Sequence, residues 1–399
     1  MNIDVNDMAV DLETYESSQE IYEPFDPQKI KINRKALNVG SIVTRLRRKS
    51  ITLAPSYQRG EVWDLKKKSQ LIESLLLRIP LPSFYVAEGD NGEYEVVDGQ
   101  QRLTAIRDFY FENGNIEKNS NGLGFKLEGL EYLKKFEGHQ CSNLPTSLQQ
   151  NMEEGQLDFI VIDNNTAEDV KFIIFSRINR GGVSLSEQEV RHALYNGPSS
   201  LLLGDLSDWP PFRDNYLKYF AKEKMGEREL ILRALAFMVR PYTCFTQETR
   251  MADFLSETML IINATPNFES HRFLRKFGKN GAKLILLNDV DEIKNRFVKG
   301  FKRSSSLFKE HAFRRSLKGE RKTPVNKALF EVWVALFSTL SSDKYKVILS
   351  RSDYFFKKYR GLLADPSFQR AITRDVLTAT GVATRHKKIQ EMISDVISS

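Results

Sequence analysis

The residues with the clearest capacity for chemistry lie in the stretch VVDGQQRLTAIRDFY, at positions 96–110. Asp98, Gly99, two glutamines and Arg102 stand where an apolar run gives way to apolar residues at helical spacing. Backbone N–H groups at a helix start, with a glycine for close approach and an exposed arginine in the first turn, form an anion site suited to phosphate. A structural explanation is also open, because Asp98 as N-cap and Gln101 three positions later match a capping box.

The surrounding pattern places this stretch at a corner between a strand and a helix. SFYVA at 83–87 and EYEVV at 93–97, separated by EGDNG, predict a β-hairpin that leads into Asp98. Residues 38–47 predict a short helix, and Asp64 caps a further helix. QLDFIVID at 156–163 predicts another buried strand.

From about residue 197 the pattern is almost entirely helical. Amphipathic helices are predicted at 227–239, 250–262, 281–297, 326–340 and 387–398. Because 399 residues exceed the size at which one core usually stops growing, we expect two domains and an α+β fold class. The expected divisions are an acidic mobile arm at 1–28, a mixed domain at 29–196 and a helical domain at 197–399.

Charge is distributed unevenly along the chain, which carries a net charge of +7. Eight carboxylates and no Lys or Arg precede Lys29, whereas residues 294–322 hold eleven Lys or Arg and two Glu. Phenylalanines are interleaved with these cations, a combination that favours a DNA-binding patch that tracks phosphates and stacks on bases. The alternative is a pair of amphipathic helices whose phenylalanines are core residues. The patch residues are Lys299, Lys302, Arg303, Arg314, Arg315 and Lys318.

Several functional classes are disfavoured. No apolar run reaches membrane length, so no membrane association is expected, and the acidic N-terminus does not resemble a secretory signal. Two distant cysteines favour a cytoplasmic location over a disulfide framework. The sequence contains no Walker P-loop, and the five histidines have no metal-binding spacing.

Three separate motifs follow one another in the first half of the chain. They are PSYQRGEVW at 55–63, DGQQR at 98–102, and INRGG at 178–182 followed by LSEQEVR at 185–191. Their order and spacing resemble the GmrS-type family, which is the ParB/sulfiredoxin-like half of GmrSD modification-dependent restriction systems and of phosphorothioate-sensing defence proteins. The resemblance covers roughly residues 38–195, and it implies a ParB/sulfiredoxin-like fold there.

The resemblance implies that DGQQR binds and hydrolyses a nucleoside triphosphate. Catalytic roles fall to Asp98, Gln100, Gln101 and Arg102, and a Mg²⁺ ion would be held by Asp98. Nucleotide contacts would come from Gly99, Arg102, Arg59, Asn179 and Arg180. Tyr57, Gln58 and Arg59 would line a pocket that reads a DNA modification or assists at the phosphates.

These expectations combine into a nucleotide-dependent DNA sensor of anti-phage defence. Its partners would be DNA, with or without modification, and a separate nuclease, because no HNH nuclease half is recognised in this sequence; a homodimer is left open. One alternative is a non-hydrolysing ParB-like clamp that closes on DNA when nucleotide binds. A second alternative is a nuclease in its own right.

Overall fold

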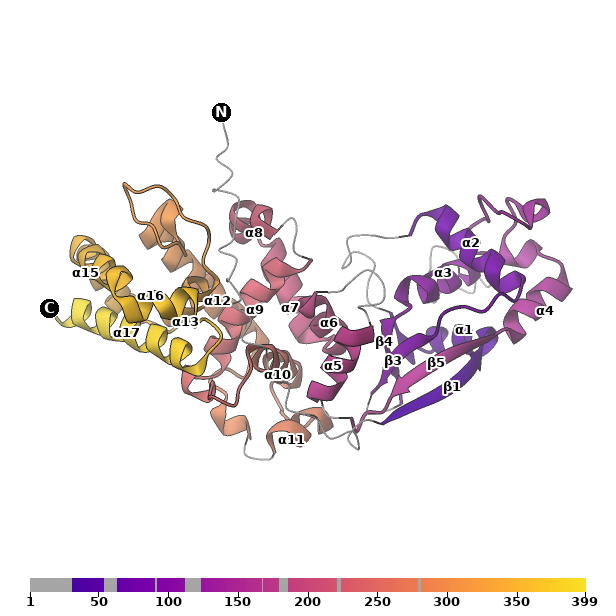
Figure 1. Ribbon diagram of the computed structural model, residues 1–399, viewed down its shortest axis with the longest axis horizontal. Coiled ribbons are helices and arrows are strands. Elements are labelled where there is room, and N and C mark those ends of the chain that lie inside the picture. Colours follow the sequence, from indigo (N-terminus) through magenta and orange to yellow (C-terminus); the bar gives the residue numbers. More distant parts are fainter. Residues whose placement is uncertain are drawn as a thin grey trace. The chain divides into compact units, whose positions relative to one another are not determined.

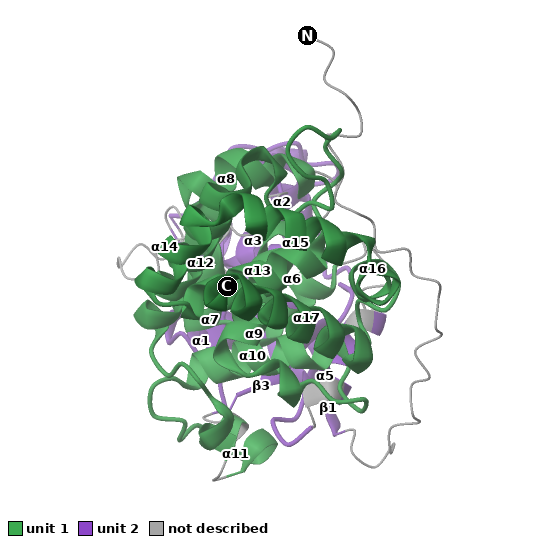
Figure 2. Cartoon of the chain, turned by 90° about the vertical axis from the view of Figure 1, so that its left-hand side faces the viewer, with its two compact units in different colours: residues 1–22, 186–399 green, residues 23–185 purple. Residues whose placement is uncertain are grey.

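The computed structural model describes residues 31–53, 63–89, 92–111, 123–166, 168–178, 186–220, 224–278 and 281–399. The chain forms two compact units that divide between Leu185 and Ser186 (Figure 2). We call the described residues before this division the sheet unit and those after it the helical unit. The division precedes the helix α6 (Glu187–Leu194), whereas the sequence placed the boundary after residue 196.

The sheet unit contains one five-stranded mixed sheet with the strand order β1-β5-β3-β4-β2 (Figure 1). β1 is antiparallel to β5, β5 is parallel to β3, β3 is antiparallel to β4, and β4 is parallel to β2. The predicted hairpin is therefore confirmed as the β3–β4 pair. The strands are β1 (Ile32–Asn38), β2 (Ile51–Thr52), β3 (Phe84–Glu88), β4 (Tyr94–Asp98) and β5 (Gln156–Ile162).

Helices pack against the sheet and complete its core (Figure 1). Phe84 of β3 stacks on Phe159 of β5 with ring centroids 5.1 Å apart, and both rings are fully buried. Apolar residues of the first three helices cover this pair and remove it from water, which is the main driving force for the fold. The helices are α1 (Val39–Arg47), α2 (Leu65–Leu76), α3 (Gln100–Tyr110), α4 (Thr146–Glu154) and α5 (Glu168–Ile178).

Two predicted helix starts in the sheet unit are confirmed. Asn38 caps α1 by accepting a hydrogen bond from the N–H of Ser41 at 2.8 Å. Asp64 caps α2 by accepting one from the N–H of Lys67, also at 2.8 Å. Each cap satisfies an N–H group that has no partner inside the helix.

The described part of the helical unit consists of helices, short 3₁₀ turns and a single isolated β-bridge between Arg314 and Val325. The predicted helix at 281–297 is wrong at its start, because Asp289 accepts from the N–H of Glu292 and α12 begins only at Val290. The helices are α6 (Glu187–Leu194), α7 (Pro198–Asp208), α8 (Pro210–Tyr216), α9 (Gly226–Val239), α10 (Met251–Ala264), α11 (His271–Phe277), α12 (Val290–Phe308), α13 (Lys327–Thr339), α14 (Ser342–Ser350), α15 (Ser352–Ala364), α16 (Pro366–Thr373) and α17 (Ala379–Ser398).

A buried ionic triad joins three helices of this unit. Glu331 of α13 accepts hydrogen bonds from Arg233 of α9 at 2.8 Å and from Nε of Arg385 of α17 at 2.8 Å. All three side chains are at most 1% exposed. No helix among the described residues is long and apolar enough to cross a bilayer.

Candidate functional site

The DGQQR motif forms a tight corner between β4 and α3. The pairing of β3 with β4 is irregular here, since Tyr85 lies opposite Asp98 while Val86 lies opposite Val96. Val97 is therefore an extra residue on β4, as in a β-bulge, and bulges redirect the residues that follow them. The corner predicted from the sequence is confirmed as a change from strand to helix.

Gly99 is the turning point of this corner and cannot be replaced without strain. Its backbone adopts the left-handed conformation, with φ of 91° and ψ of 10°. A Cβ atom at this position would lie 2.4 Å from Cδ1 of the buried Phe84 ring. Both the backbone angle and the close packing on β3 therefore require glycine.

Arg102 is not the exposed first-turn arginine that the sequence suggested. Its guanidinium donates to Asp98 Oδ2 at 3.0 Å, to the carbonyl of Ser83 at 3.2 Å and to the carbonyl of Pro82. It also lies 4.4 Å from the centroid of the Phe84 ring, and the side chain is only 12% exposed. Burial lowers the pKa of Arg102, and the neighbouring Asp98 carboxylate partly opposes this effect. Arg102 thus clamps the start of α3 to the segment that enters β3.

The capping box predicted from Asp98 and Gln101 is wrong. Gly99 is the N-cap of α3, and no side chain caps the helix. The Gln101 side chain instead accepts a hydrogen bond from the N–H of Trp63 at 3.4 Å, and the Asp98 carboxylate pairs with Arg102. Neither residue therefore caps the helix, and the Asp98 side chain is 43% exposed.

Gln100 lies below the corner and not on its surface. It is 4% exposed in the first turn of α3, among the core-facing positions of that helix. A buried amide there is poorly placed to hold an attacking water at the surface. Asp98, with 43% of its side chain exposed, is more exposed than Gln100 or Arg102.

The start of α3 has the properties of an anion site. Its first turn carries no acidic residue and no side-chain cap, so the positive end of the helix dipole lies at this corner. Asp98, at the end of β4, supplies a carboxylate directly before this helix start. A phosphate and a cation are thus both compatible with the corner.

A metal site built from protein ligands alone is not found in the described part of the chain, where no three His, Cys, Asp or Glu side chains group together. Mg²⁺ is commonly held by one or two carboxylates together with substrate phosphates. Asp98 suits that mode of binding, because its carboxylate is exposed beside the helix start.

Five of the predicted site residues lie outside the described residues. They are Tyr57, Gln58, Arg59, Asn179 and Arg180. The sequence also missed contacts of described residues that build the corner, namely those of Trp63, Phe84 and Tyr85. The hairpin prediction contained part of this information, because strand alternation places Phe84 on the core face.

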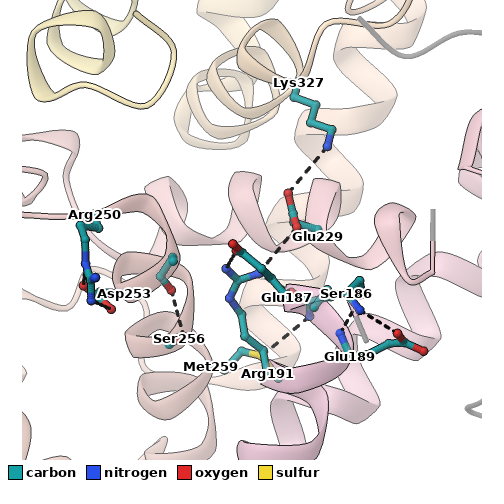
Figure 3. A network of polar contacts seen from close by, with 12 residues as sticks. Ser186, Glu187, Glu189, Arg191, Glu229, Arg250, Asp253, Ser256, Met259 and Lys327 are labelled. Carbon is teal, nitrogen blue, oxygen red and sulfur yellow. Dashed lines mark hydrogen bonds and ion pairs between the residues drawn. The ribbon is translucent and has the colours of Figure 1, made fainter. Parts of the chain in front are cut away.

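The second half of the third motif is explained by packing in the helical unit (Figure 3). Ser186 and Glu189 form a capping box at the start of α6, and both of its hydrogen bonds are present. Arg191 is 1% exposed and donates a hydrogen bond to the Glu187 carboxylate at 2.7 Å. Its guanidinium also lies 3.7 Å from the Glu229 carboxylate. The Glu229 carboxylate lies 3.7 Å from the Lys327 ammonium. Burial raises the pKa of Glu229, but Lys327 and Arg191 outweigh burial and hold it below its ordinary value.

The phenylalanines of the basic segment at 294–322 are core residues. All four rings are at most 5% exposed, so the expectation that they stack on bases is wrong and the amphipathic alternative is confirmed for them. The exposed fractions are 0% for Phe297, 2% for Phe301, 5% for Phe308 and 1% for Phe313.

Two arginines of the predicted DNA patch serve the fold of the helical unit. Arg303 donates to the carbonyls of Phe337 at 3.1 Å and Leu340 at 2.7 Å, at the end of α13. Arg314, 5% exposed, donates to the Tyr219 hydroxyl at 2.7 Å. The remaining members are the exposed Lys302 and Lys318 and the partly buried Lys299 and Arg315.

The sheet unit also has an open groove of about 590 Å³ away from the DGQQR corner. It lies along α2 and the end of α3, where Lys68 and Asp108 form an ion pair of 2.7 Å. None of the predicted site residues that the structure describes lines it. It is lined by Leu65, Lys68, Asp108, Leu123, Gly124, Phe125, Lys126 and Gln140.

Comparison with known families identifies the region that contains the corner. The family model of the GmrSD restriction endonuclease N-terminal domain matches residues 39–196. Neither the curated proteins nor the solved structures gave a match. The matched range contains all three motifs and ends just after α6. Residues 39–196 of this chain are therefore similar to the N-terminal domain of the GmrSD restriction endonucleases.

Proposed function

We propose that this protein is a nucleotide-dependent DNA sensor of a restriction-type defence system, and that it hydrolyses a nucleoside triphosphate at the DGQQR corner. The observation that carries the proposal is the uncapped start of α3 behind a left-handed glycine, inside the region that matches the GmrSD N-terminal domain. An open helix start favours bound phosphate for both geometric and electrostatic reasons.

The structure suggests a division of labour at the corner. The positive end of α3 would attract the phosphates, and Asp98 would hold Mg²⁺ or orient the attacking water. Arg102 would position these groups, because its hydrogen bonds fix the corner to the carbonyls before β3. The buried Gln100 side chain would support the helix start and not the water.

Further residues enter the proposal through the family resemblance alone. Arg59, Asn179 and Arg180 would neutralise phosphate charge, and Tyr57 with Gln58 would line the pocket that reads the DNA modification. A ParB/sulfiredoxin-like fold for the sheet unit belongs to the same proposal. The hydrogen bond from the Trp63 N–H to the Gln101 side chain supports the roles given to Tyr57, Gln58 and Arg59. It places Trp63, the residue directly after positions 54–62, at the corner.

DNA is the proposed macromolecular ligand, and a separate nuclease is the proposed effector. The match of residues 39–196 to a restriction-endonuclease domain supports an interaction with DNA. The exposed lysines of the helical unit supply positive charge for phosphate contacts, which dominate DNA affinity. In this scheme, DNA binding and nucleotide turnover together license the nuclease.

Phosphate release under three conditions tests the proposal: no DNA, plain duplex DNA and modified duplex DNA. Multiple turnovers that respond to DNA would support the sensor. Nucleotide binding without turnover would instead favour the ParB-like clamp, and nicking of a plasmid by the purified chain with Mg²⁺ would favour a nuclease.

A further inference from the structure

The segment between α12 and α13 forms a loop with a sharply defined exposed part, drawn in orange in Figure 1. Residues 318–322, with the sequence KGERK, are all exposed, and we call them the basic tip. Most residues on both sides of the tip are buried, and Arg315, Thr323 and Pro324 are partly buried. The buried residues include Phe313, Arg314, Ser316 and Leu317 before the tip and Val325 and Asn326 after it, all at most 5% exposed.

The base of this loop is held by hydrogen bonds between its two sides. Arg314 and Val325 form a β-bridge, and Ser316 Oγ accepts from the N–H of Thr323 at 3.0 Å. The Arg314 guanidinium donates to the carbonyl of Thr323 and to the hydroxyl of Tyr219. Such a base orders the tip before any ligand arrives, which reduces the entropic cost of binding.

The cations of the tip are exposed, and Lys318 and Lys322 also lie within electrostatic range of Glu310. Glu320, the only acidic residue of the tip, accepts from the N–H of Leu317 at 2.9 Å and lies 3.7 Å from Arg360. Gly319 adopts φ of 89° with open space around its Cα, so the chain reverses here without contact. Lys318 and Lys322 are exposed on either side of this turn.

The chemistry of the tip fits the backbone of a duplex better than a single strand. Proteins that hold single strands combine cations with aromatic side chains on which bases stack. The tip has no aromatic residue, and the four phenylalanines of the preceding segment are buried. Phosphate contacts alone position a protein on DNA without reading its sequence.

We propose that the basic tip, residues 318–322, binds the phosphate backbone of duplex DNA independently of sequence. This inference rests on the proposed function, because it names the surface through which the sensor engages DNA. It assigns the contact to Lys318, Arg321 and Lys322, and it gives Arg314 the part of a positioning residue at the base of the loop.

The test is the affinity for a mixed-sequence duplex at several salt concentrations. Replacing Lys318 and Lys322 by Ala should weaken binding and lower the slope of log affinity against log salt by about two, since each phosphate contact contributes about one. The matched control replaces Lys344 and Lys346, two exposed lysines of α14, by Ala and should keep the wild-type slope.

Other readouts separate the inference from the proposed function. Both double variants should unfold at the wild-type temperature and release phosphate normally without DNA, because the replaced side chains are exposed and belong to the helical unit. Equal salt slopes for the two double variants, or tighter binding of a single strand than of the duplex, would overturn the basic tip while leaving DNA sensing intact. A wild-type protein that binds no DNA would overturn both.

Discussion

At the scale of single residues, the DGQQR motif combines architecture with ligand chemistry. Gly99 and Arg102 both pack on Phe84, so two of the five motif residues are needed to form the corner at all. The Asp98 side chain is 43% exposed beside a helix start that has no side-chain cap. The motif therefore carries structural and functional constraints in the same five residues.

Replacing Gly99 by Ala should destabilise the protein more than the same replacement at a left-handed glycine with open space around it. A non-glycine residue in this conformation costs about 1–2 kcal/mol. The clash with Phe84 adds about 1–3 kcal/mol of overpacking. Gly138, with φ of 77° and no atom within 4 Å of an added Cβ, is the control that carries the backbone cost alone. Urea unfolding measures both variants, and equal losses would contradict the close packing at the corner.

Sequence reasoning located the corner but not its internal contacts. The hairpin and the helix follow from local periodicity. The Arg102 clamp depends on carbonyls about twenty positions earlier, which only the pairing of β3 with β4 brings near. Local sequence favoured a capping box at this corner. In the folded protein, tertiary contacts of Arg102 occupy Asp98 instead.

At the scale of helices, buried ion pairs inside the helical unit connect particular helices. Glu331 connects α13 to α9 and α17 through Arg233 and Arg385. The sequence alone predicts that arginine-rich segments are exposed, because composition does not show whether a cation has a buried partner. Arg303 and Arg314 show the same effect, since each binds groups of its own unit.

Replacing Glu331 by Gln should be strongly destabilising. Removing one partner of a buried ion pair leaves an uncompensated charge in the core, which costs about 3–5 kcal/mol. The control is Glu391→Gln on α17, whose carboxylate is 63% exposed and 3.9 Å from Lys387. Surface changes of this kind stay within about 0.5 kcal/mol. Similar unfolding midpoints for the two variants would contradict the prediction that the triad stabilises the helical unit.

At the scale of the whole molecule, the third motif contributes to both units. Ile178, the first residue of INRGG, ends α5 in the sheet unit, whereas Ser186 to Arg191 belong to the helical unit. The family match ends at residue 196, beyond the division between the units at 185 and 186. Sequence similarity and packing therefore place the domain boundary on different sides of α6.

The opposite charges of residues 1–28 and 294–322 lead to a further prediction, although the acidic residues lie outside the described residues. Carboxylates can compete with DNA phosphates for a basic surface at low ionic strength. Deleting residues 1–26 should tighten binding of plain DNA and raise basal phosphate release at low salt. An unchanged affinity and rate at low salt would reduce the arm to a solubilising segment.

The central claim is that the DGQQR corner binds and hydrolyses a nucleotide, and Asp98 tests it most directly. Asp98→Asn keeps the shape of the side chain and an acceptor for Arg102 but removes the charge that would hold Mg²⁺. Asp158→Asn, an exposed carboxylate of β5, is the control. Steady-state phosphate release with Mg²⁺ and DNA should fall by about 100-fold or more in Asp98→Asn and stay at the wild-type level in Asp158→Asn. Equal release by a folded Asp98→Asn protein and the wild type would contradict the assignment of the site.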